Sequence, residues 1–321
     1  MRYRKLGKTG PEVSEISFGS WAIGGAMWGG KRDDDARLSL ARAFERGVTL
    51  YDTALVYGDG HSERLVGEFA RAHRDQVYVA TKVPPKAYNW PAPPDAPLRD
   101  NFPADWIISC AEKSLKNLGV ERIDLLQLHV WADAWTDQHE WYEALEKLRA
   151  QGKVRLTGIS INSHDPRSAL RVVQARMVDA LQVFYNIFDQ SPEDELYPAC
   201  IEHGVGVLAR VPFDEGSLTG KLTVDTKFPA GDFRAQYFGG KLLAETVERV
   251  EALRPIVEGA APSMARGALR YVLSHPAVSA AIPGMRTLHQ VDENTAASDD
   301  GPLPASVVEA LHAHRWVRRP Y

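Results

Sequence analysis

The chain of 321 residues is poor in cysteine, and its two cysteines, Cys110 and Cys200, lie in helix-like segments without metal-ligand spacing. This pattern favours reduced thiols over a disulfide framework. No apolar run approaches the ~20 residues that a membrane-spanning helix needs. The N-terminus enters polar sequence directly, with Met1-Arg2-Tyr3-Arg4-Lys5, and shows no targeting segment. We therefore expect a cytoplasmic protein.

The chain also lacks an excess of basic residues. It has 38 Lys and Arg against 42 Asp and Glu, which gives a formal net charge of -4 and no broad basic field for nucleic acid. Hydrophobic residues make up 44% of the chain and charged residues 25%, as in an ordinary globular enzyme. We expect a small-molecule substrate, with neither nucleic acid nor a membrane as partner. The sequence does not specify an oligomeric state.

Apolar, strand-like segments alternate with amphipathic, helix-like segments along the chain. The expected strands are an N-terminal hairpin of residues 2–6 and 12–14, followed by eight strands near 16–18, 49–52, 77–82, 124–129, 155–160, 180–184, 206–209 and 279–282. The expected helices cover residues 34–46, 62–73, 104–118, 137–151, 166–175, 192–203 and 263–274. We expect Asp34 and Ser62 to cap the first two helices, and Gly47, Gly119, Gly152 and Gly204 to end helices in the left-handed conformation.

This alternation is typical of a parallel α/β sheet, and eight units favour closure into a (β/α)8 TIM barrel with an N-terminal β-hairpin and C-terminal helices. Such barrels reach this length as one domain, so we expect a single domain over residues 1–321. An open doubly wound sheet is the alternative. It is disfavoured because no Gly-x-Gly-x-x-Gly motif follows an early strand.

Four side chains that handle protons lie at the ends of three successive strands. Asp52 ends one strand and Tyr57 follows it, while Lys82 and His129 close the next two. In a parallel barrel these ends lie side by side, so the four residues are expected to share one pocket. Taken singly, each is more often a core, rim or structural residue, and only the combination makes a strong site prediction.

The combination suits carbonyl reduction. The reference pKa of tyrosine is about 10, and the ammonium group of Lys82 is expected to lower it for Tyr57. Asp52 would keep Lys82 charged and oriented. A neutral His129 would hydrogen-bond the substrate oxygen.

Two stretches interrupt the alternation. Residues 84–103 contain seven prolines together with Tyr88, Trp90 and Phe102, and they follow the Lys82 strand. Their aromatic side chains are expected either to wall the substrate pocket or to pin a surface loop. Residues 223–241 follow the seventh strand, and we interpret them as a loop that covers a cofactor. Aromatic candidates for the pocket wall are Trp21, Trp28, Tyr88, Trp90, Trp131 and Phe213.

The ordered motifs resemble those of the aldo-keto reductase superfamily in its bacterial form. They are Asp52-Thr53-Ala54 with Tyr57-Gly58 and Ser62-Glu63, Thr81-Lys82, Leu128-His129, Gly158-Ile159-Ser160-Ile161-Asn162, Gln182-Val183-Phe184-Tyr185-Asn186, Ser217-Leu218-Thr219-Gly220-Lys221, and Ile282-Pro283-Gly284-Met285-Arg286-Thr287 before Gln290, Glu293 and Asn294. The resemblance implies an eight-stranded barrel, a nicotinamide dinucleotide, usually NADPH, and no metal. It also implies that Tyr57 donates the proton, that Lys82 and Asp52 adjust the acidity of Tyr57, and that His129 orients the carbonyl.

The resemblance further implies a set of cofactor contacts. The nicotinamide carboxamide would be held by Ser160, Asn162 and Gln182, with Gly19 and Trp21 lining the pocket beside it. Ser217, Leu218, Gly220 and Lys221 would follow the pyrophosphate. Gly284 and Arg286 would face the adenosine phosphate, and Gln290, Glu293 and Asn294 the ribose and adenine.

One position departs from the family pattern. Arg210 stands where many members have a tyrosine that stacks on the nicotinamide, although a guanidinium can also stack on a flat ring. Arg286 is the one obvious cation for a 2'-phosphate, so use of NAD(H) as well as NADP(H) stays open. The alternatives in function are a regulatory or redox-sensing protein of the potassium-channel β-subunit type and, remotely, a metal-dependent aldolase or isomerase.

Overall fold

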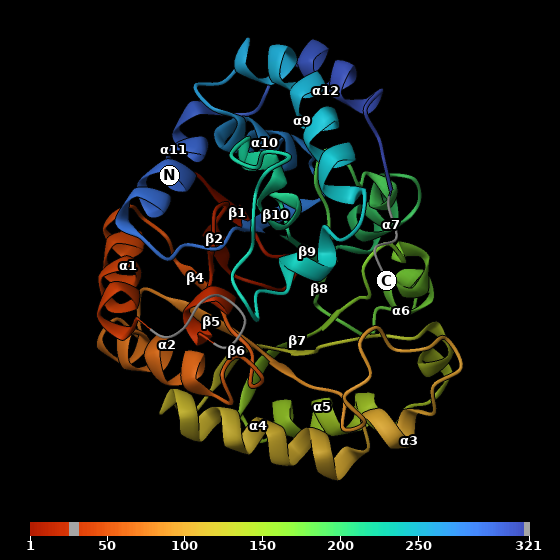
Figure 1. The fold of residues 1–321 in the computed structure, drawn as a ribbon. Coiled ribbons are helices and arrows are strands. Elements are labelled where there is room, and N and C mark those ends of the chain that lie inside the picture. The colour runs from red at the N-terminus through yellow and green to blue at the C-terminus, as the bar shows by residue number, and fades with distance from the viewer. Residues whose placement is uncertain (26–31, 318–321) are drawn as a thin grey trace.

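The structure, a computed structural model, describes residues 1–25 and 32–317. Eight parallel strands form its centre, and helices surround them (Figure 1). Neighbours follow chain order from β3 to β10. Their bounds are β3 (Phe18–Gly19), β4 (Leu50–Asp52), β5 (Tyr78–Val83), β6 (Ile123–Leu128), β7 (Val154–Ser160), β8 (Ala180–Phe184), β9 (Gly206–Arg210) and β10 (Val278–Ile282). All eight expected barrel strands are confirmed.

The first and last strands meet, which closes the sheet into a barrel. The amide of Ser17 donates to the carbonyl of Ala281 at 2.8 Å, and the amide of Gly19 donates to Pro283 at 3.0 Å. The amide of Ala281 donates in return to Glu15 at 2.9 Å. The expected (β/α)8 barrel is therefore confirmed, and the alternative of an open doubly wound sheet is wrong. The expected hairpin is also present, as β1 (Tyr3–Lys5) paired antiparallel with β2 (Glu12–Ser14).

The expected helices are present, some of them divided or shortened. The α-helices are α1 (Asp33–Glu45), α2 (His61–Ala72), α3 (Leu98–Asn101), α4 (Ala104–Leu118), α5 (Glu140–Ala150), α6 (Leu170–Gln174), α7 (Leu196–His203), α8 (Arg234–Tyr237), α9 (Leu242–Glu258), α10 (Met264–Ser274), α11 (Leu288–Asp300) and α12 (Ala305–His312). Short 3-10 helices are η1 (Trp21–Gly24), η2 (Asp133–Asp137), η3 (Pro166–Ala169), η4 (Ser191–Glu193) and η5 (Asp214–Thr219).

The glycines expected at the C-terminal ends of helices are confirmed, but the residues expected at the N-terminal ends are not. Gly47, Gly119, Gly152 and Gly204 all have positive φ, as a left-handed helix end requires. The N-caps expected at Asp34 and Ser62 are wrong. The cap positions of α1 and α2 are Arg32 and Gly60, and neither makes a side-chain cap hydrogen bond. The Ser62 hydroxyl instead donates to Ser20 inside the protein.

The barrel interior changes from apolar to polar along the strands. Leu6 and Val13 of the hairpin region pack with inward-facing residues, including Leu50, Ala80 and Leu125, in one buried cluster. Side chains two positions apart on a strand point to the same face. The next inward positions therefore hold polar groups, which are Asp52, Lys82, Gln127, Gln182 and Arg210. These polar residues lie at the carboxyl ends of the strands, and the buried apolar cluster fills the barrel interior below them.

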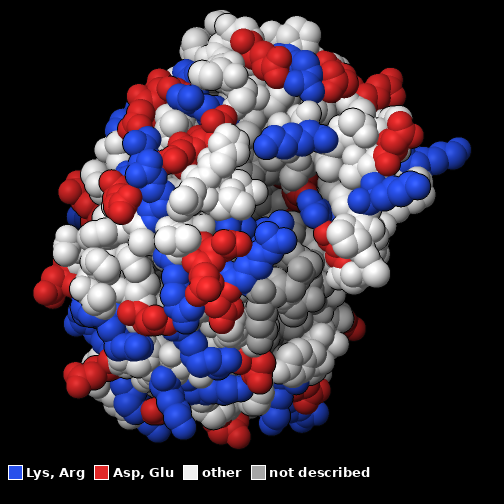
Figure 2. Space-filling view, turned by 60° about the vertical axis from the view of Figure 1, so that its left-hand side comes forward, with Lys and Arg blue, Asp and Glu red and all other residues white. Residues whose placement is uncertain are grey.

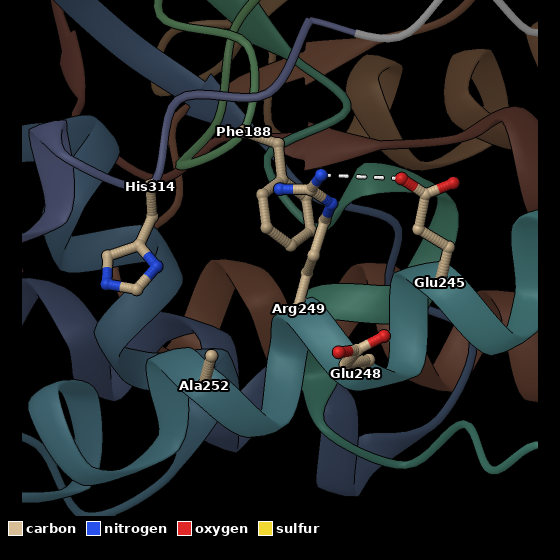
Figure 3. A pocket seen from close by; sticks show the side chains of 6 residues that line it. All are labelled: Phe188, Glu245, Glu248, Arg249, Ala252 and His314. Atoms are coloured by element: carbon tan, nitrogen blue, oxygen red, sulfur yellow. Dashed lines mark hydrogen bonds and ion pairs between the residues drawn. The ribbon is translucent and has the colours of Figure 1, made fainter.

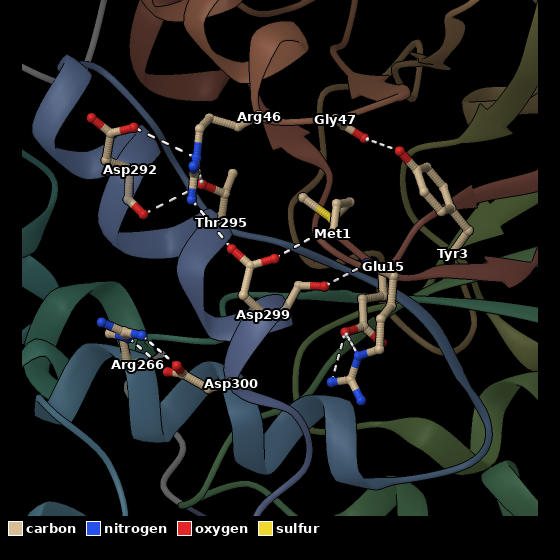
Figure 4. A network of polar contacts seen from close by, with 12 residues as sticks. Met1, Tyr3, Glu15, Arg46, Gly47, Arg266, Asp292, Thr295, Asp299 and Asp300 are labelled. Carbon is tan, nitrogen blue, oxygen red and sulfur yellow. Dashed lines mark hydrogen bonds and ion pairs between the residues drawn. The ribbon is translucent and has the colours of Figure 1, made fainter.

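Ion pairs join the N-terminus to α11 beside the barrel seam (Figure 4). The terminal ammonium of Met1 bonds Asp299 at 2.6 Å, and Arg46 bonds Thr295 at 3.2 Å. The buried carboxylate of Glu15 accepts from Arg4 at 2.7 Å. These contacts tie the N-terminus and α11 to the barrel.

Candidate active site

A buried ion pair forms the floor of the site. The Lys82 ammonium, with no exposed surface, donates to both oxygens of Asp52 at 2.9 and 2.7 Å and to the carbonyl of Thr53 at 2.8 Å. A lysine ammonium has three N–H donors, so these three hydrogen bonds use all of them. Burial lowers the pKa of Lys82, while Asp52 opposes this shift. Lys82 therefore reaches its neighbours through its field rather than by a further hydrogen bond.

Tyr57 lies above this pair, half-buried between three groups. Its ring centre is 5.2 Å from the Lys82 Nζ, 5.8 Å from the His129 ring and 6.2 Å from the Trp21 ring. Burial, and then the charge of Asp52, raise the pKa of Tyr57, whereas Arg210 opposes the rise. This direction is opposite to the one expected from a Tyr57–Lys82 pairing alone. The main reason is that burial disfavours the charged phenolate, and the negative charge of Asp52 adds to this effect.

His129 completes the predicted group of four. Its ring meets Tyr57 edge-on and is also met edge-on by Trp90 at 5.3 Å. Burial, followed by the positive charges of Lys82 and Arg210, lowers the pKa of His129 well below 6.5. The imidazole is therefore neutral at neutral pH and suited to donating a hydrogen bond. The structure brings all four predicted residues together.

A second layer of polar residues holds the first, and the sequence analysis assigned no individual role to Thr53, Ser62 or Ser20 in it. Gln182 donates to Asp52 Oδ1 at 2.8 Å. Thr53, whose carbonyl accepts from Lys82, donates its hydroxyl to Ser62 at 2.9 Å, and Ser62 donates to Ser20 at 2.7 Å.

A similar link runs from β5 to the helices outside it. The fully buried carboxylate of Glu63 accepts from Thr81 at 2.6 Å and from Asn117 at 2.7 Å. The motif pairs Ser62-Glu63 and Thr81-Lys82 are thus explained by contacts that fix the strand ends.

Asn162 holds the proline-rich segment against the barrel. Its Oδ1 accepts from the amide of Ala92 at 3.3 Å, and its Nδ2 donates to the carbonyl of Ala92 at 3.0 Å and to Trp131 at 3.1 Å. The same segment carries Trp90, which contacts His129. Residues 84–103 therefore border the site, and Tyr88, exposed at their tip, lies 6.2 Å from Trp90.

Arg210 ends β9, and its guanidinium reaches across the end of β8 toward the residues that follow β7. Its guanidinium is 5.4 Å from the Phe184 ring and donates to the carbonyl of Ile161 at 3.1 Å and to Ser163 at 3.2 Å. Ser160, at the end of β7, is buried. The charge of Arg210 contributes to the lowered pKa of both Lys82 and His129. Arg210 therefore belongs to the electrostatic environment of the site.

Segment 223–241 contacts both η5 and η1. The buried carboxylate of Asp214 accepts from Ser217 at 2.5 Å and from Tyr237 at 2.8 Å. The ring of Phe233 lies 4.9 Å from that of Trp21. Gly220 ends η5 with a φ of 70°, Leu218 is buried in the core, and Lys221 is exposed. The segment thus spans from η5 to the side of Tyr57.

The residues after β10 form a compact turn into α11. The amide of Arg286 donates to Gln290 at 2.8 Å, and Asn294 donates to the carbonyl of Gly284 at 3.3 Å. Glu293 accepts from Ser263, the residue that caps α10, at 2.5 Å. A side chain added at Gly284 would meet no atom within 4 Å, so its backbone faces open space.

Two arginines that the sequence analysis missed lie near Arg286. Burial, followed by the neighbouring charges of Arg234 and Arg32, lowers the pKa of Arg286. Arg234 is held by Asp232 through contacts of 3.0 and 2.6 Å. Three guanidinium groups from distant parts of the chain therefore create a positive region beside the Gly284 turn. It is a suitable environment for a phosphate.

The expected aromatic pocket is only partly correct. Trp21 and Trp90 contact Tyr57 and His129, as described. Trp131 instead is fully buried, donates its indole N–H to Ser168 at 2.9 Å and packs in the core with Trp135 and Trp141. Phe213 packs against the same core. Trp28 lies outside the described residues.

Two surface hollows lie outside this group of residues. One, of about 300 Å³, is lined by α9, Phe188 and His314, and an ion pair of Arg249 with Glu245 crosses it (Figure 3). The other, of about 430 Å³, lies between α4 and the backbone on either side of Tyr57. Neither is lined by a residue of the predicted group of four, and the second is lined by Tyr88, one of the aromatic candidates for the pocket wall.

In the described part of the chain, neither the surface charge on the face shown in Figure 2 nor a cluster of metal-ligating side chains indicates a second site. Acidic and basic side chains are interspersed on the face shown in Figure 2. Within residues 1–25 and 32–317, no three or more His, Cys, Asp or Glu side chains gather as metal ligands would. Over the same residues no helix has both the length and the apolar character needed to cross a membrane.

Comparison with known proteins agrees with this geometry. Residues 15–315 match the model of the aldo/keto reductase family. The chain is 32% identical to aldo-keto reductase YhdN of Bacillus subtilis over 91% of its length and 87% of the relative's. It is 30% identical to the NADH-specific methylglyoxal reductase of Escherichia coli, covering 97% and 99% of the two chains.

The structural comparison gives the same family. The holo form of aldo-keto reductase AKR11C1 from Bacillus halodurans superposes with a TM-score of 0.79 at 26% identity, covering 98% of this chain and 96% of that one. The chain belongs to the aldo/keto reductase family and is an oxidoreductase that uses a nicotinamide cofactor.

Proposed function

We propose that the protein is an NADP(H)-dependent reductase of small aldehydes or ketones, which also acts in reverse on alcohols or sugars. The observation that carries this proposal is the buried Lys82–Asp52 pair beneath Tyr57 and His129. An acid, a neutral imidazole and a fixed positive charge face the same space. These are the groups that reduction of a carbonyl oxygen requires.

In this proposal Tyr57 delivers the proton to the carbonyl oxygen. Burial raises its pKa and keeps the phenol protonated before reaction. The Lys82 ammonium, 5.2 Å from the ring centre, would stabilise the phenolate as it forms. His129, neutral because its pKa is lowered, donates a hydrogen bond that orients the oxygen. Trp90 packs against His129 and restricts the imidazole to one orientation. When bound, the nicotinamide supplies the hydride.

The residues around the tetrad fit such a cofactor. The three-arginine region at Arg286 suits phosphate groups, and the open backbone of Gly284 allows close approach. We propose that Ser160, Asn162 and Gln182 hold the carboxamide, and that Gly19, Trp21 and Arg210 border the ring. The remaining contacts would come from Ser217, Leu218 through its backbone, Gly220, Lys221, Gly284, Arg286, Gln290, Glu293 and Asn294.

The test is Tyr57→Phe, which removes only the phenol oxygen. We expect carbonyl reduction to fall by about 10² to 10⁴, the contribution typical of general acid catalysis. Fluorescence titration should show nearly unchanged cofactor binding. Tyr78→Phe, at the opposite end of β5, is the matched control and should keep full activity. Retention of more than roughly a tenth of kcat in Tyr57→Phe, far above that range, would mean that another group protonates the product.

A further inference from the structure

Gln127 is a polar side chain sealed inside the barrel. It lies on β6, with Lys82 of β5 and Gly158 of β7 as its partners in register. The residue has no exposed surface. Neither Oε1 nor Nε2 of its amide has a hydrogen-bond partner among residues 1–25 and 32–317. A buried amide in this state is costly, because it has lost its bonds to water without replacement.

The surroundings of Gln127 leave space for its side chain at the level of the tetrad. Gly158 has no side chain, and a Cβ placed there would come within 3.2 Å of the Gln127 Cγ and within 2.5 Å of the carbonyl of Ala180. The glycine therefore accommodates the glutamine. A buried amide with unsatisfied donor and acceptor atoms is the kind of group that holds an internal water.

A second unsatisfied atom belongs to the residue that follows the same strand. His129 Nδ1 is buried and has no hydrogen-bond partner within the described part of the chain. His129 directly follows β6 and continues its ladder by donating its amide to the carbonyl of Val83 at 2.9 Å, so residues 127 and 129 face the same side with their Cα atoms about 7 Å apart. A single water with two hydrogen bonds of about 2.8 Å joins polar atoms up to about 5.6 Å apart, and the flexible glutamine side chain allows its amide to come that close to Nδ1. The two orphaned groups can therefore be satisfied together.

We propose that Gln127 is a positioning residue for His129 and acts through a buried water between the amide and Nδ1. The amide anchors the water, and the water donates to Nδ1. A neutral imidazole that accepts at Nδ1 carries its proton at Nε2. This tautomer presents Nε2–H to the substrate oxygen, so the inference rests on the role proposed above for His129.

The tautomer can be measured without any turnover. Long-range ¹⁵N–¹H correlation spectra of the ¹⁵N-histidine-labelled protein distinguish Nε2–H from Nδ1–H, and His129→Gln assigns the signal. We expect wild-type His129 to be the neutral Nε2–H form at pH 7. Gln127→Leu should give a mixture of tautomers. A wild-type Nδ1–H form, or a Gln127→Leu spectrum identical to wild type, overturns the proposal.

Gln127→Glu gives a prediction of opposite sign. A carboxylate only accepts hydrogen bonds and carries negative charge, so it should favour Nδ1–H and raise the pKa of His129. An unchanged tautomer and titration in this variant also overturn the proposal. Leu125→Met, one inward position below on β6, is the matched control and should leave the His129 signal unchanged.

Kinetics provide an independent measurement. Gln127→Leu should lower kcat for a small aldehyde by roughly tenfold, less than the 10² to 10⁴ of a complete proton donor, with unchanged cofactor affinity. Equal turnover of Gln127→Leu and wild type contradicts the positioning role. If Tyr57→Phe keeps its activity, the proposed function fails, yet the spectra still decide the tautomer.

Discussion

The side-chain amide of Asn162 and the backbone of Ala92 hydrogen-bond to each other in both directions, at 3.3 and 3.0 Å. Two peptide groups in neighbouring strands would pair in the same way. One side chain at the end of β7 therefore fixes the middle of the segment that brings Trp90 to His129. The position of Trp90 beside His129 therefore depends on this pair of residues.

Asn162→Ala should loosen that segment without unfolding the barrel. Each hydrogen bond contributes about 0.5 to 1.5 kcal/mol, so losing two should speed exchange of the Ala92 amide by roughly tenfold to a hundredfold. Amide hydrogen exchange measures this directly. Ser160→Ala, at the same strand end, is the control. If both variants exchange at the same rate, the Asn162 bonds do not hold the segment.

Lys82→Met should leave the Asp52 carboxylate buried without its partner. Breaking a buried pair in this way typically costs about 3 to 5 kcal/mol, and turnover should be nearly lost. Adding Asp52→Asn removes the unpaired charge, so the double variant should recover stability but not turnover. Urea denaturation and steady-state kinetics on the two variants test this. Recovery of turnover in the double variant would show that Lys82 has only a structural role.

Arg286→Ala should weaken the binding of NADPH much more than the binding of NADH. If the guanidinium binds a 2'-phosphate, its loss should cost about 1.5 to 3 kcal/mol of NADPH binding, a tenfold to hundredfold rise in Kd. NADH lacks that phosphate and should bind almost as before. Fluorescence titration with both dinucleotides contains its own control, because a folding defect weakens both. Equal weakening of the two means that the phosphate site lies elsewhere.

The lowered pKa of His129 should appear in the pH dependence of stability. An unfolded histidine titrates near 6.5, whereas folded His129 stays neutral to lower pH. Below about pH 6.5 the unfolded state thus binds a proton that the folded state does not, and stability falls as pH falls.

His129→Gln removes this linkage. The stability of wild type relative to the variant should therefore decrease between pH 7.5 and 5, as measured by denaturation at each pH. His275, whose pKa burial also lowers, is present in both proteins and cancels in the difference. Parallel profiles would show that His129 protonates normally in the folded protein.

The strands and the tetrad could be predicted because each depends on local pattern. Asp52, Lys82 and His129 follow apolar runs, and the barrel places the ends of such runs together. The missed α9 had a signal as well, since Thr246, Val250, Leu253 and Val257 are buried at helical spacing, but Pro255 interrupts the pattern.

Other features depend on contacts that the sequence alone does not specify. The pairing of Asn162 with Ala92 joins residues 70 positions apart and involves a backbone group. Trp131 could line a pocket or pack in the core, and only the presence of Trp135 and Trp141 around it decides. The gathering of Arg234 with Arg286 likewise requires knowing where segment 223–241 folds.

The seam between β3 and β10 brings together an early and a late part of the chain, and the proposed cofactor site needs both. Gly19 and Trp21 lie on one side of this seam, and Gly284 and Arg286 lie on the other. A nascent chain has its whole tetrad long before the ribosome releases Gly284, yet it cannot form the proposed cofactor site. A dinucleotide bound on both sides would act as a clamp that stabilises the closed barrel by mass action. Binding of the dinucleotide should therefore make opening of the seam rarer than it is in the empty enzyme.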